Sequence, residues 1–387
     1  MNNEYSVIQT DPWMLDSRIT YLNHGSFGAR VKPIFDYQME LKREFEFSPV
    51  NFLDRQPSRV DEARQIVAAF LGAQPEGFGF VDNATTGIGC VVNSISFSKG
   101  DEILTTNHVY NGVRQVLTKI ANESGCSYRE VAIPLPLNDS EEIVQAILGS
   151  LTDETKLLVI DHVSSSSAIL FPVHEIARIC REKGILLLVD GAHAAGMLDL
   201  NIDSIGCDWY VGNLHKWVCA PIGAGFVWTS ERYRETTHPM TVSHWLYQGY
   251  VQEFNWQGTK DVSAWLSAAK AVQWGSEIGW NRIRKHNHAL VTRMHAYLID
   301  MWDVEPISPL DGSMLGSMAT ISLPKYCPSK MDQCLALRDE LYLRNSIEVP
   351  IFEFQNRGVV RVSAQLYSDF NDVKALNGAI NDIYISK

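Results

Sequence analysis

The sequence lacks the features that mark several large classes of protein. Its seven cysteines are scattered and form no Cys-x-x-Cys pair, so neither a zinc site nor a disulfide framework is indicated. No apolar run reaches the roughly 18 residues of a membrane span. The stretch 1–16 has no basic region followed by an apolar run, so no secretory signal is visible. We therefore expect reduced thiols, no metal site, no membrane span and a cytoplasmic location.

Clusters of positive charge are also missing. Lys and Arg number 33 against 45 Asp and Glu, which gives a formal net charge of −12, and an acidic chain without basic patches is a poor candidate for binding nucleic acid. No Gly-x-Gly-x-x-Gly follows an early strand, so little supports a nicotinamide-dependent dehydrogenase. What is present is an ordinary globular composition, with 45% hydrophobic residues in a chain of 387, long enough for two or three domains.

Short aliphatic runs alternate with amphipathic helical patterns through the first half of the chain. Runs with continuous apolar centres are typical of parallel strands buried on both faces. Because ligands bind beyond the carboxyl ends of such strands, the polar residues that follow each run are the candidates for a site. The four clearest runs are Gly77–Val81, Asp101–Thr106, Thr155–Val163 and Gly184–His193.

The remaining segments outline the domains. Residues 31–71 have a helical pattern with a polar break at 46–59, and a helical segment at 261–280 leads into a C-terminal part. That part contains two strand-like runs, Gly316–Leu323 and Gly358–Gln365, with helical patterns around them. We expect an α/β protein with three parts: an N-terminal arm (1–20), a large domain (21–280) and a small α+β domain (281–387).

Lys216 is the only formally charged side chain between Trp209 and Ser230. One interpretation is an amine that reaches the surface from a half-buried strand end. The other is a desolvated amine with a lowered pKa, which acts as a nucleophile or a Schiff-base partner.

Two residues near the end of another aliphatic run favour the second interpretation. Asp190 ends the run "ILLLVD", and His193 follows three residues later. Taken alone, Asp190 is also compatible with a structural cap of the next helix. An aspartate, a histidine and a later lysine together suit an aldehyde cofactor with a basic ring nitrogen: the aspartate keeps the nitrogen protonated and the lysine holds the aldehyde as a Schiff base. This is the chemistry of pyridoxal 5′-phosphate (PLP).

A phosphate group needs its own binding site, and "DNATTGIG" offers one. Small and hydroxyl residues stand here at the start of a predicted helix, where the backbone N–H groups of Ala84, Thr85 and Thr86 and the helix dipole favour an anion. The same stretch is also compatible with an ordinary helix start.

With these residues in view, the chain resembles the class V aminotransferase group of PLP-dependent enzymes of fold type I. The closer resemblance is to isopenicillin N epimerase-like proteins and to their cysteine-desulfurase and C–S-lyase relatives. It implies a large domain with a mostly parallel seven-stranded sheet covered by helices, a small C-terminal α+β domain, and a homodimer with shared active sites. The segments that carry it, in chain order, are "YLNHGSFGA", "SPVNFLDRQP", "DNATTG", "VDGAHAAG", "GNLHKW" and "FNWQGTKD".

The resemblance also assigns roles to residues. It makes Lys216 the Schiff-base lysine, Asp190 the partner of the pyridine nitrogen, and His193 a neighbour of the cofactor's O3′, and it places Tyr110 over the pyridine face. It makes Arg361 the residue that binds the substrate carboxylate. The other residues that it implies are Ala84, Thr85, Thr86 and His215 at the phosphate, Ser165 and Asn213 beside the cofactor, Thr259 at the phosphate of the neighbouring subunit, and Asn23 and His24 at the substrate.

One departure from the relatives narrows the function. Cysteine desulfurases carry a nucleophilic cysteine shortly before the carboxylate-binding arginine, but Asn345–Arg361 contains none, so we do not expect a persulfide-forming desulfurase. We expect an enzyme that acts at the α carbon of an amino acid through Lys216 and is epimerase-like, with C–S lyase, aminotransferase and a non-catalytic relative as alternatives. An epimerase that uses two bases needs a second acid–base group, for which His24, Tyr110 or a cysteine are candidates.

Overall fold

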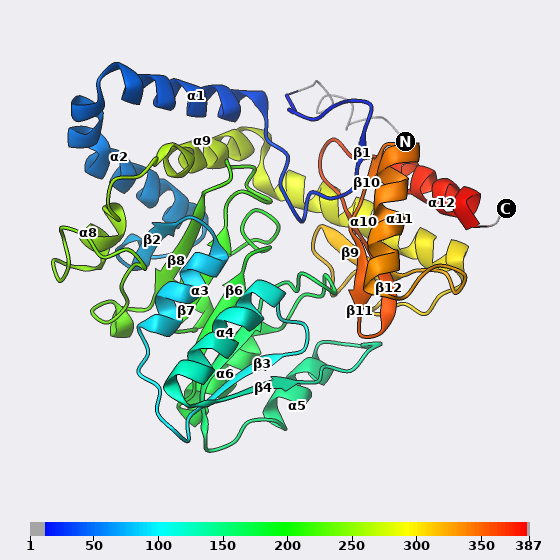
Figure 1. Ribbon diagram of the computed structural model, residues 1–387, viewed down its shortest axis with the longest axis horizontal. Coiled ribbons are helices and arrows are strands. Elements are labelled where there is room, and N and C mark those ends of the chain that lie inside the picture. Colours follow the sequence, from blue (N-terminus) through cyan, green and yellow to red (C-terminus); the bar gives the residue numbers. More distant parts are fainter. Residues whose placement is uncertain (1–11, 385–387) are drawn as a thin grey trace.

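The structure, a computed structural model, describes residues 12–384 and is built around a seven-stranded sheet (Figure 1). The five strands from β7 to β4 are parallel, while β8 runs antiparallel to both of its neighbours. The prediction of a mostly parallel, seven-stranded sheet is therefore confirmed. In spatial order the strands are β2 (Phe78–Val81), β8 (Gly225–Thr229), β7 (Trp209–Asn213), β6 (Leu186–Gly191), β5 (Thr155–Asp161), β3 (Glu102–Thr106) and β4 (Ser127–Val131).

Helices cover both faces of this sheet because its central strands are apolar on both sides. On β6, Leu187 and Val189 belong to the hydrophobic core of one face and Leu188 to that of the other, as the alternation of side chains along a strand requires. One core includes α1 (Lys32–Phe47), α2 (Pro49–Phe70), α5 (Glu141–Leu148), α6 (Val173–Lys183), α7 (Ile202–Ile205) and α9 (Ser263–Ile278). The other includes α3 (Ala84–Asn93), α4 (Asn111–Ser124) and α8 (Tyr250–Asn255).

The N-terminal helical region differs from the sequence prediction. The polar break expected at 46–59 is helical except at Ser48, which separates α1 from α2. Pro49 occupies the first turn of α2, where a missing N–H costs nothing. Phe52 and Gln56 point into the protein, so the polar stretch is the outer surface of a helix and not a loop.

The C-terminal part has its own hydrophobic core. A three-stranded antiparallel sheet, in the order β11 (Ile351–Phe354), β12 (Arg357–Ser363) and β9 (Met318–Ser322), packs with α10 (Trp280–Trp302), α11 (Met331–Asn345) and α12 (Phe370–Tyr384). Leu22 joins this core, because β1 (Thr20–Tyr21) pairs with β10 (Ile347–Glu348). The predicted domain division at residue 280 stays a prediction. None of the helices within residues 12–384 is long and apolar enough to span a lipid bilayer.

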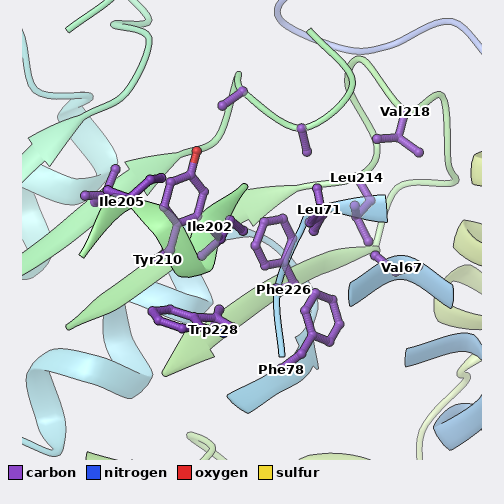
Figure 2. Close-up of a cluster of buried hydrophobic side chains, with 14 of the residues drawn as sticks. Val67, Leu71, Phe78, Ile202, Ile205, Tyr210, Leu214, Val218, Phe226 and Trp228 are labelled. Carbon is purple, nitrogen blue, oxygen red and sulfur yellow. The ribbon is translucent and has the colours of Figure 1, made fainter. Parts of the chain in front are cut away.

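Aromatic packing supports the loop that follows β7. Phe226 stacks on Phe78 with 5.2 Å between ring centroids and lies nearly parallel to Tyr210. Leu214 and Val218, which flank Lys216 in the sequence, are fully buried in the same core (Figure 2). Full burial of an aliphatic side chain contributes about 1.5–3 kcal/mol, so these two residues hold the lysine-bearing loop to the sheet.

Candidate active site

A cavity of about 1080 Å³ lies where the carboxyl ends of the parallel strands meet the start of α3 and the small sheet. It brings together residues that lie as much as 336 positions apart in the chain, from Gly25 to Arg361. Eleven of the predicted site residues line it: Ala84, Thr85, Thr86, Tyr110, Ser165, Asp190, His193, Asn213, His215, Lys216 and Arg361. Asn23, His24 and Thr259 do not.

Close backbone contacts fix the Lys216 loop. A Cβ atom added to Gly28 would lie 2.1 Å from the carbonyl oxygen of Lys216, and one on Gly196 would lie 2.6 Å from the carbonyl carbon of Trp217. Gly196 also has a φ of +84°, a backbone conformation that residues other than glycine rarely adopt. The loop thus packs between two segments, and glycine at positions 28 and 196 is what lets their backbones approach it so closely. This packing fixes the backbone position of Lys216.

The amine of Lys216 lies in an unusual electrostatic environment. Loss of water around it, together with the positive charge of Arg361, lowers its pKa to about 7, while the carboxylates of Asp190 and Asp161 oppose this change. An amine with that pKa is neutral in a substantial fraction of molecules at physiological pH. It can therefore act as a nucleophile or take up a proton.

His193 is the nearest polar neighbour of that amine. Its Nε2 lies 3.1 Å from the Nζ of Lys216, within hydrogen-bond distance. The ring is almost fully buried, and burial and the charge of Lys216 hold the pKa of the imidazole well below its usual value. The neutral ring can accept or donate a hydrogen bond, and its buried Nδ1 has no partner in the described chain.

Two carboxyl groups stand side by side at the ends of β5 and β6. Asp190 accepts a hydrogen bond from the backbone N–H of Ala192 at 2.9 Å. Asp161 is paired with it in register and also lines the cavity. Burial raises the pKa of both groups, and the charge of Asp190 adds to the effect on Asp161. The sequence analysis missed Asp161, although "LLVID" ends in the same way as "LLLVD".

The predicted anion site lies at the start of α3, where the N–H groups of Ala84 and Thr86 already have side-chain acceptors. Asn83 caps the helix by accepting the N–H of Thr86 at 2.9 Å, and the side-chain oxygen of Asn213 accepts the N–H of Ala84 at 2.8 Å. His215 stands across the cavity with its Nδ1 3.3 Å from the carbonyl oxygen of Ala224, and burial lowers its pKa to about 4. Asn213 therefore fixes the helix terminus. The partial positive charge of this terminus makes it suitable for a phosphate.

Arg361 reaches the cavity from the small sheet. One of its terminal nitrogens donates to the carbonyl oxygen and the hydroxyl of Ser165 at 2.6 and 3.1 Å, and the other donates to the hydroxyl of Ser26 at 2.6 Å. The guanidinium is 4% exposed, and burial lowers its pKa to about 10. Within residues 12–384 no carboxylate forms an ion pair with it, and its Nε has no partner. A ligand carboxylate is the natural counter-ion.

Tyr110 stands at the mouth of the cavity with half of its surface exposed. A Cβ atom at Gly112 would lie 2.7 Å from the tyrosine ring, so the absence of a side chain there lets the ring lie across the start of α4. An aromatic ring in this place can cover a flat ligand.

The three predicted residues outside the cavity have other surroundings. The fully buried His24 lies behind the lysine loop, with Nδ1 3.0 Å from the hydroxyl of Tyr367 and Nε2 3.1 Å from the carbonyl oxygen of Lys216. Burial lowers the pKa of His24 to about 3, and the residue supports the loop from behind. Asn23 is half-buried beside it, and Thr259 is exposed on the surface. No cysteine in the described chain lines the cavity.

Sequence reasoning also missed residues that the C-terminal part contributes. Met331, Phe352, Phe354 and Gln355 line the cavity, and so does Ser26, which accepts a hydrogen bond from Arg361. Their sequence surroundings are ordinary strand, turn and helix patterns, so no local signal marks them. Only the packing of the small sheet against the large one brings them to the site.

The chain is similar to proteins of known function. The aminotransferase class-V family matches residues 51–376. Isopenicillin N epimerase from Amycolatopsis lactamdurans is 29% identical over 95% of this chain and 96% of its own, and L-cysteine desulfhydrase from Arabidopsis thaliana is 30% identical over 94% and 88%. Among solved structures, the apo cysteine desulfurase of Thermococcus onnurineus NA1 superposes with a TM-score of 0.78 at 21% identity, over 95% of both chains.

The chain belongs to the aminotransferase class-V family. A variant of the C–S lyase C-DES, whose structure holds glycine covalently linked to PLP, also superposes, with a TM-score of 0.83 at 19% identity over 95% and 97% of the two chains. The predictions of the family, of the fold type I architecture and of an enzyme that depends on PLP are thus confirmed.

The polar groups that line the cavity are of the kinds that PLP requires. Asp161, His193 and Arg361 line the cavity, and each has a buried polar atom without a partner in the described chain. Such atoms are costly unless a ligand satisfies them. A helix terminus suited to a phosphate, carboxyl groups suited to a protonated ring nitrogen and a neutral amine suited to an aldehyde all face one space.

Proposed function

We propose that this class-V enzyme removes the α-proton of an amino acid with Lys216 and that its outcome is epimerase-like. Bound PLP supplies an electron sink for the negative charge that develops at the α carbon. In this proposal Lys216 attaches the cofactor, Asp190 accepts a hydrogen bond from its ring nitrogen, and His193 contacts its ring oxygen. The start of α3, with Thr85, Thr86 and His215, holds the phosphate.

The position of Arg361 supports an amino acid as substrate. Its buried guanidinium, held by Ser26 and Ser165, has hydrogen-bond capacity left for a carboxylate. A carboxylate fixed there has its α carbon within the same cavity as the Lys216 amine. The arrangement orients the substrate before any bond breaks, which lowers the entropic part of the barrier.

The position of the Lys216 amine, inside the cavity and 3.1 Å from the Nε2 of His193, is the single observation that carries the proposal. With a pKa of about 7, the amine is ready to take up a proton and still acidic enough, once protonated, to return it. Delivery of a proton to the opposite face of the α carbon by a second group inverts the configuration. Tyr110 is the proposed second acid–base group, because of the three earlier candidates it alone lies at the cavity, while His24 and the cysteines do not.

A C–S (β) lyase is the second candidate, because its reaction needs no second acid–base group. Loss of a sulfur substituent from the β carbon needs only one group that takes the α-proton and can protonate the leaving thiol. The absence of a cysteine from the lining in residues 12–384 supports elimination of sulfide or thiol over persulfide formation. The L-cysteine desulfhydrase of Arabidopsis thaliana, at 30% identity, adds support for this candidate.

We also propose a homodimer in which Thr259 contacts the cofactor phosphate of the partner subunit. Thr259 is exposed and away from its own cavity, which is compatible with a role across an interface. Large apolar side chains nearby in the sequence, Met240, Val242 and Tyr247, are more than half exposed, as expected of a surface that another chain covers. Sedimentation analysis of wild type and of Thr259→Glu tests the dimer and its interface.

A cytoplasmic location remains part of the proposal. All seven cysteines are free in the structure, and six of them are buried. Free thiols in this number suit a reducing compartment. Cell fractionation tests the location directly.

One experiment separates the catalytic outcomes. The purified enzyme with PLP is incubated in deuterium oxide with a panel of L- and D-amino acids and S-substituted cysteines. Exchange of the α-hydrogen with inversion and without keto-acid release supports the epimerase. Release of pyruvate, ammonia and a thiol supports the lyase and contradicts the epimerase, while conversion of the cofactor to its amine form together with release of the intact keto acid indicates transamination.

A further inference from the structure

Asp161 forms a carboxyl pair with Asp190. The two residues are in register on adjacent parallel strands, so their side chains point to the same face of the sheet. Each has 4% of its surface exposed, and both line the cavity. Only Asp190 has a role in the reaction as proposed so far.

The two carboxyl groups differ in their hydrogen bonds. One oxygen of Asp190 accepts the backbone N–H of Ala192 at 2.9 Å. The Oδ2 of Asp161 is buried without a partner in the described chain. A carboxylate oxygen that accepts an N–H is stabilised as the anion, whereas a buried oxygen without a donor is not.

The charged groups that face Asp161 come from three directions. Asp190 lies on β6, Lys216 follows β7, and Arg114 lies on α4. The guanidinium of Arg114 is already paired with Glu130, at 2.6 and 3.1 Å, so its charge is largely neutralised. The lysine amine has a lowered pKa and is only partly protonated near neutral pH. Neither of the two cations that face Asp161 therefore brings a full, unpaired positive charge to keep both carboxyl groups ionised.

We propose that Asp161 is a positioning residue that keeps its proton in the resting site and so makes Asp190 the only anion of the pair. Two adjacent buried carboxylates cannot both ionise without a large electrostatic cost. The proton stays on the group whose buried Oδ2 has no donor. Burial and the neighbouring charge raise the pKa of Asp161 well above its ordinary value, in the direction that this assignment requires.

The consequence for the reaction rests on the proposed function. A single anion on Asp190 matches the single positive charge of a protonated ring nitrogen. The neutral Asp161 adds an O–H donor next to Asp190 and contributes no second negative charge. Asp161 thereby fixes where the negative charge lies without itself exchanging protons with the substrate.

Infrared spectroscopy of the cofactor-free protein at pH 8 tests the assignment. The wild type is expected to show the carbonyl stretch of a protonated carboxylic acid, and Asp161→Asn is expected to lose it. As a matched control, Asp208→Asn removes a carboxyl group just before β7 that accepts the N–H of Leu187 at 2.9 Å, and it should leave the band unchanged. Absence of the band from wild type, or its loss in Asp190→Asn alone, would overturn the proposal.

The pH dependence of stability gives a second measurement on the same variant. A folded-state pKa above the unfolded value makes the wild type lose stability as pH rises above about 4, whereas an asparagine carries no such penalty. The melting temperature of cofactor-free Asp161→Asn should therefore exceed that of wild type by a margin that grows between pH 5 and pH 8. A constant or shrinking margin would contradict a protonated Asp161.

Cofactor binding distinguishes a failure of this inference from a failure of the proposed function. Asparagine imitates a neutral Asp161, so Asp161→Asn should bind PLP within about threefold of wild type, whereas Asp190→Asn should bind much more weakly. If wild type itself takes up no cofactor, the proposed function fails while the infrared result still stands. If wild type binds PLP and Asp161→Asn binds as weakly as Asp190→Asn, the proton assignment is wrong.

Discussion

The Nζ of Lys216 lies 3.1 Å from the Nε2 of His193, and the two residues come from different strand ends of one sheet. Neither group keeps its ordinary pKa: burial lowers both, and the charge of Lys216 lowers that of His193 further. The neutral imidazole can therefore hold a hydrogen bond to the amine, and the amine itself can take up a proton near pH 7.

Replacement of Lys216 should abolish both cofactor attachment and turnover. Borohydride treatment of the wild type loaded with PLP, followed by peptide mass analysis, should find the reduced adduct at this residue and none in Lys216→Ala. An adduct at another lysine would contradict the assignment.

The pH dependence of cofactor-free stability provides a separate test of Lys216. Its pKa is lowered from 10.5 to about 7 in the folded chain, so between these values the unfolded chain binds more protons and stability rises with pH. Lys216→Met should flatten that rise and increase the melting temperature at pH 7. Equal pH profiles for the two proteins would show that the amine is solvated.

Exchange of Arg361 for lysine should weaken substrate binding specifically. Lysine retains the charge but loses the planar pair of donors, and loss of a charge-assisted hydrogen bond corresponds to about a 10- to 100-fold fall in kcat/KM. Most of the change should appear in KM, while the affinity for PLP stays near that of wild type. A fall in PLP affinity of the same size would assign Arg361 to the cofactor.

Substitutions of His193 should depend on the hydrogen-bonding capacity of the new residue. His193→Gln keeps a donor and an acceptor and should retain kcat within about tenfold, whereas His193→Ala should lose about 10- to 100-fold. The absorption spectrum of bound cofactor should shift in the alanine variant only. Equal kinetics and spectra for both variants would mean that His193 only fills space.

Gly28→Ala should displace the lysine loop through a direct steric clash with its backbone. The added methyl group would lie 2.1 Å from the carbonyl oxygen of Lys216, and backbone cannot move away as a flexible side chain does. We expect a lower melting temperature and weaker PLP binding. Gly378→Ala is the matched control: nothing lies within 4 Å of its added methyl group, and alanine in a helix should stabilise by about 0.5–1 kcal/mol.

His295→Leu should make the protein more resistant to acid. His295 is fully buried in the C-terminal core, neither ring nitrogen has a partner in the described residues, and burial lowers its pKa to about 4. Because the unfolded value is near 6.5, the stability that the neutral ring permits is present above pH 6.5 and is lost as pH falls toward 4. The variant should melt higher than wild type at pH 5, by more than at pH 8. The opposite order would contradict a buried neutral ring.

The sequence by itself determined the sheet and the local parts of the site. Continuous aliphatic runs such as "LLVI" and "LLLV" can be buried only on both faces of a strand, which specified a parallel sheet covered by helices. The sequence also marks Asp190, because it is a polar residue at the end of such a run. It marks Lys216 because this is an isolated charge in an apolar stretch. These signals are local, because burial of a few adjacent residues produces them.

The tertiary structure decided the rest, because adjacency between strands leaves no mark in either strand alone. Asp161 becomes the neighbour of Asp190 only through the register of β5 with β6. His24, predicted at the substrate, lies behind the lysine loop because the segment around Gly28 packs against that loop. Ser26 and Ser165 meet at Arg361 only because the small sheet closes over the large one. A chain can specify each strand by its own hydrophobic pattern, but which polar groups share a proton depends on distances that only packing fixes.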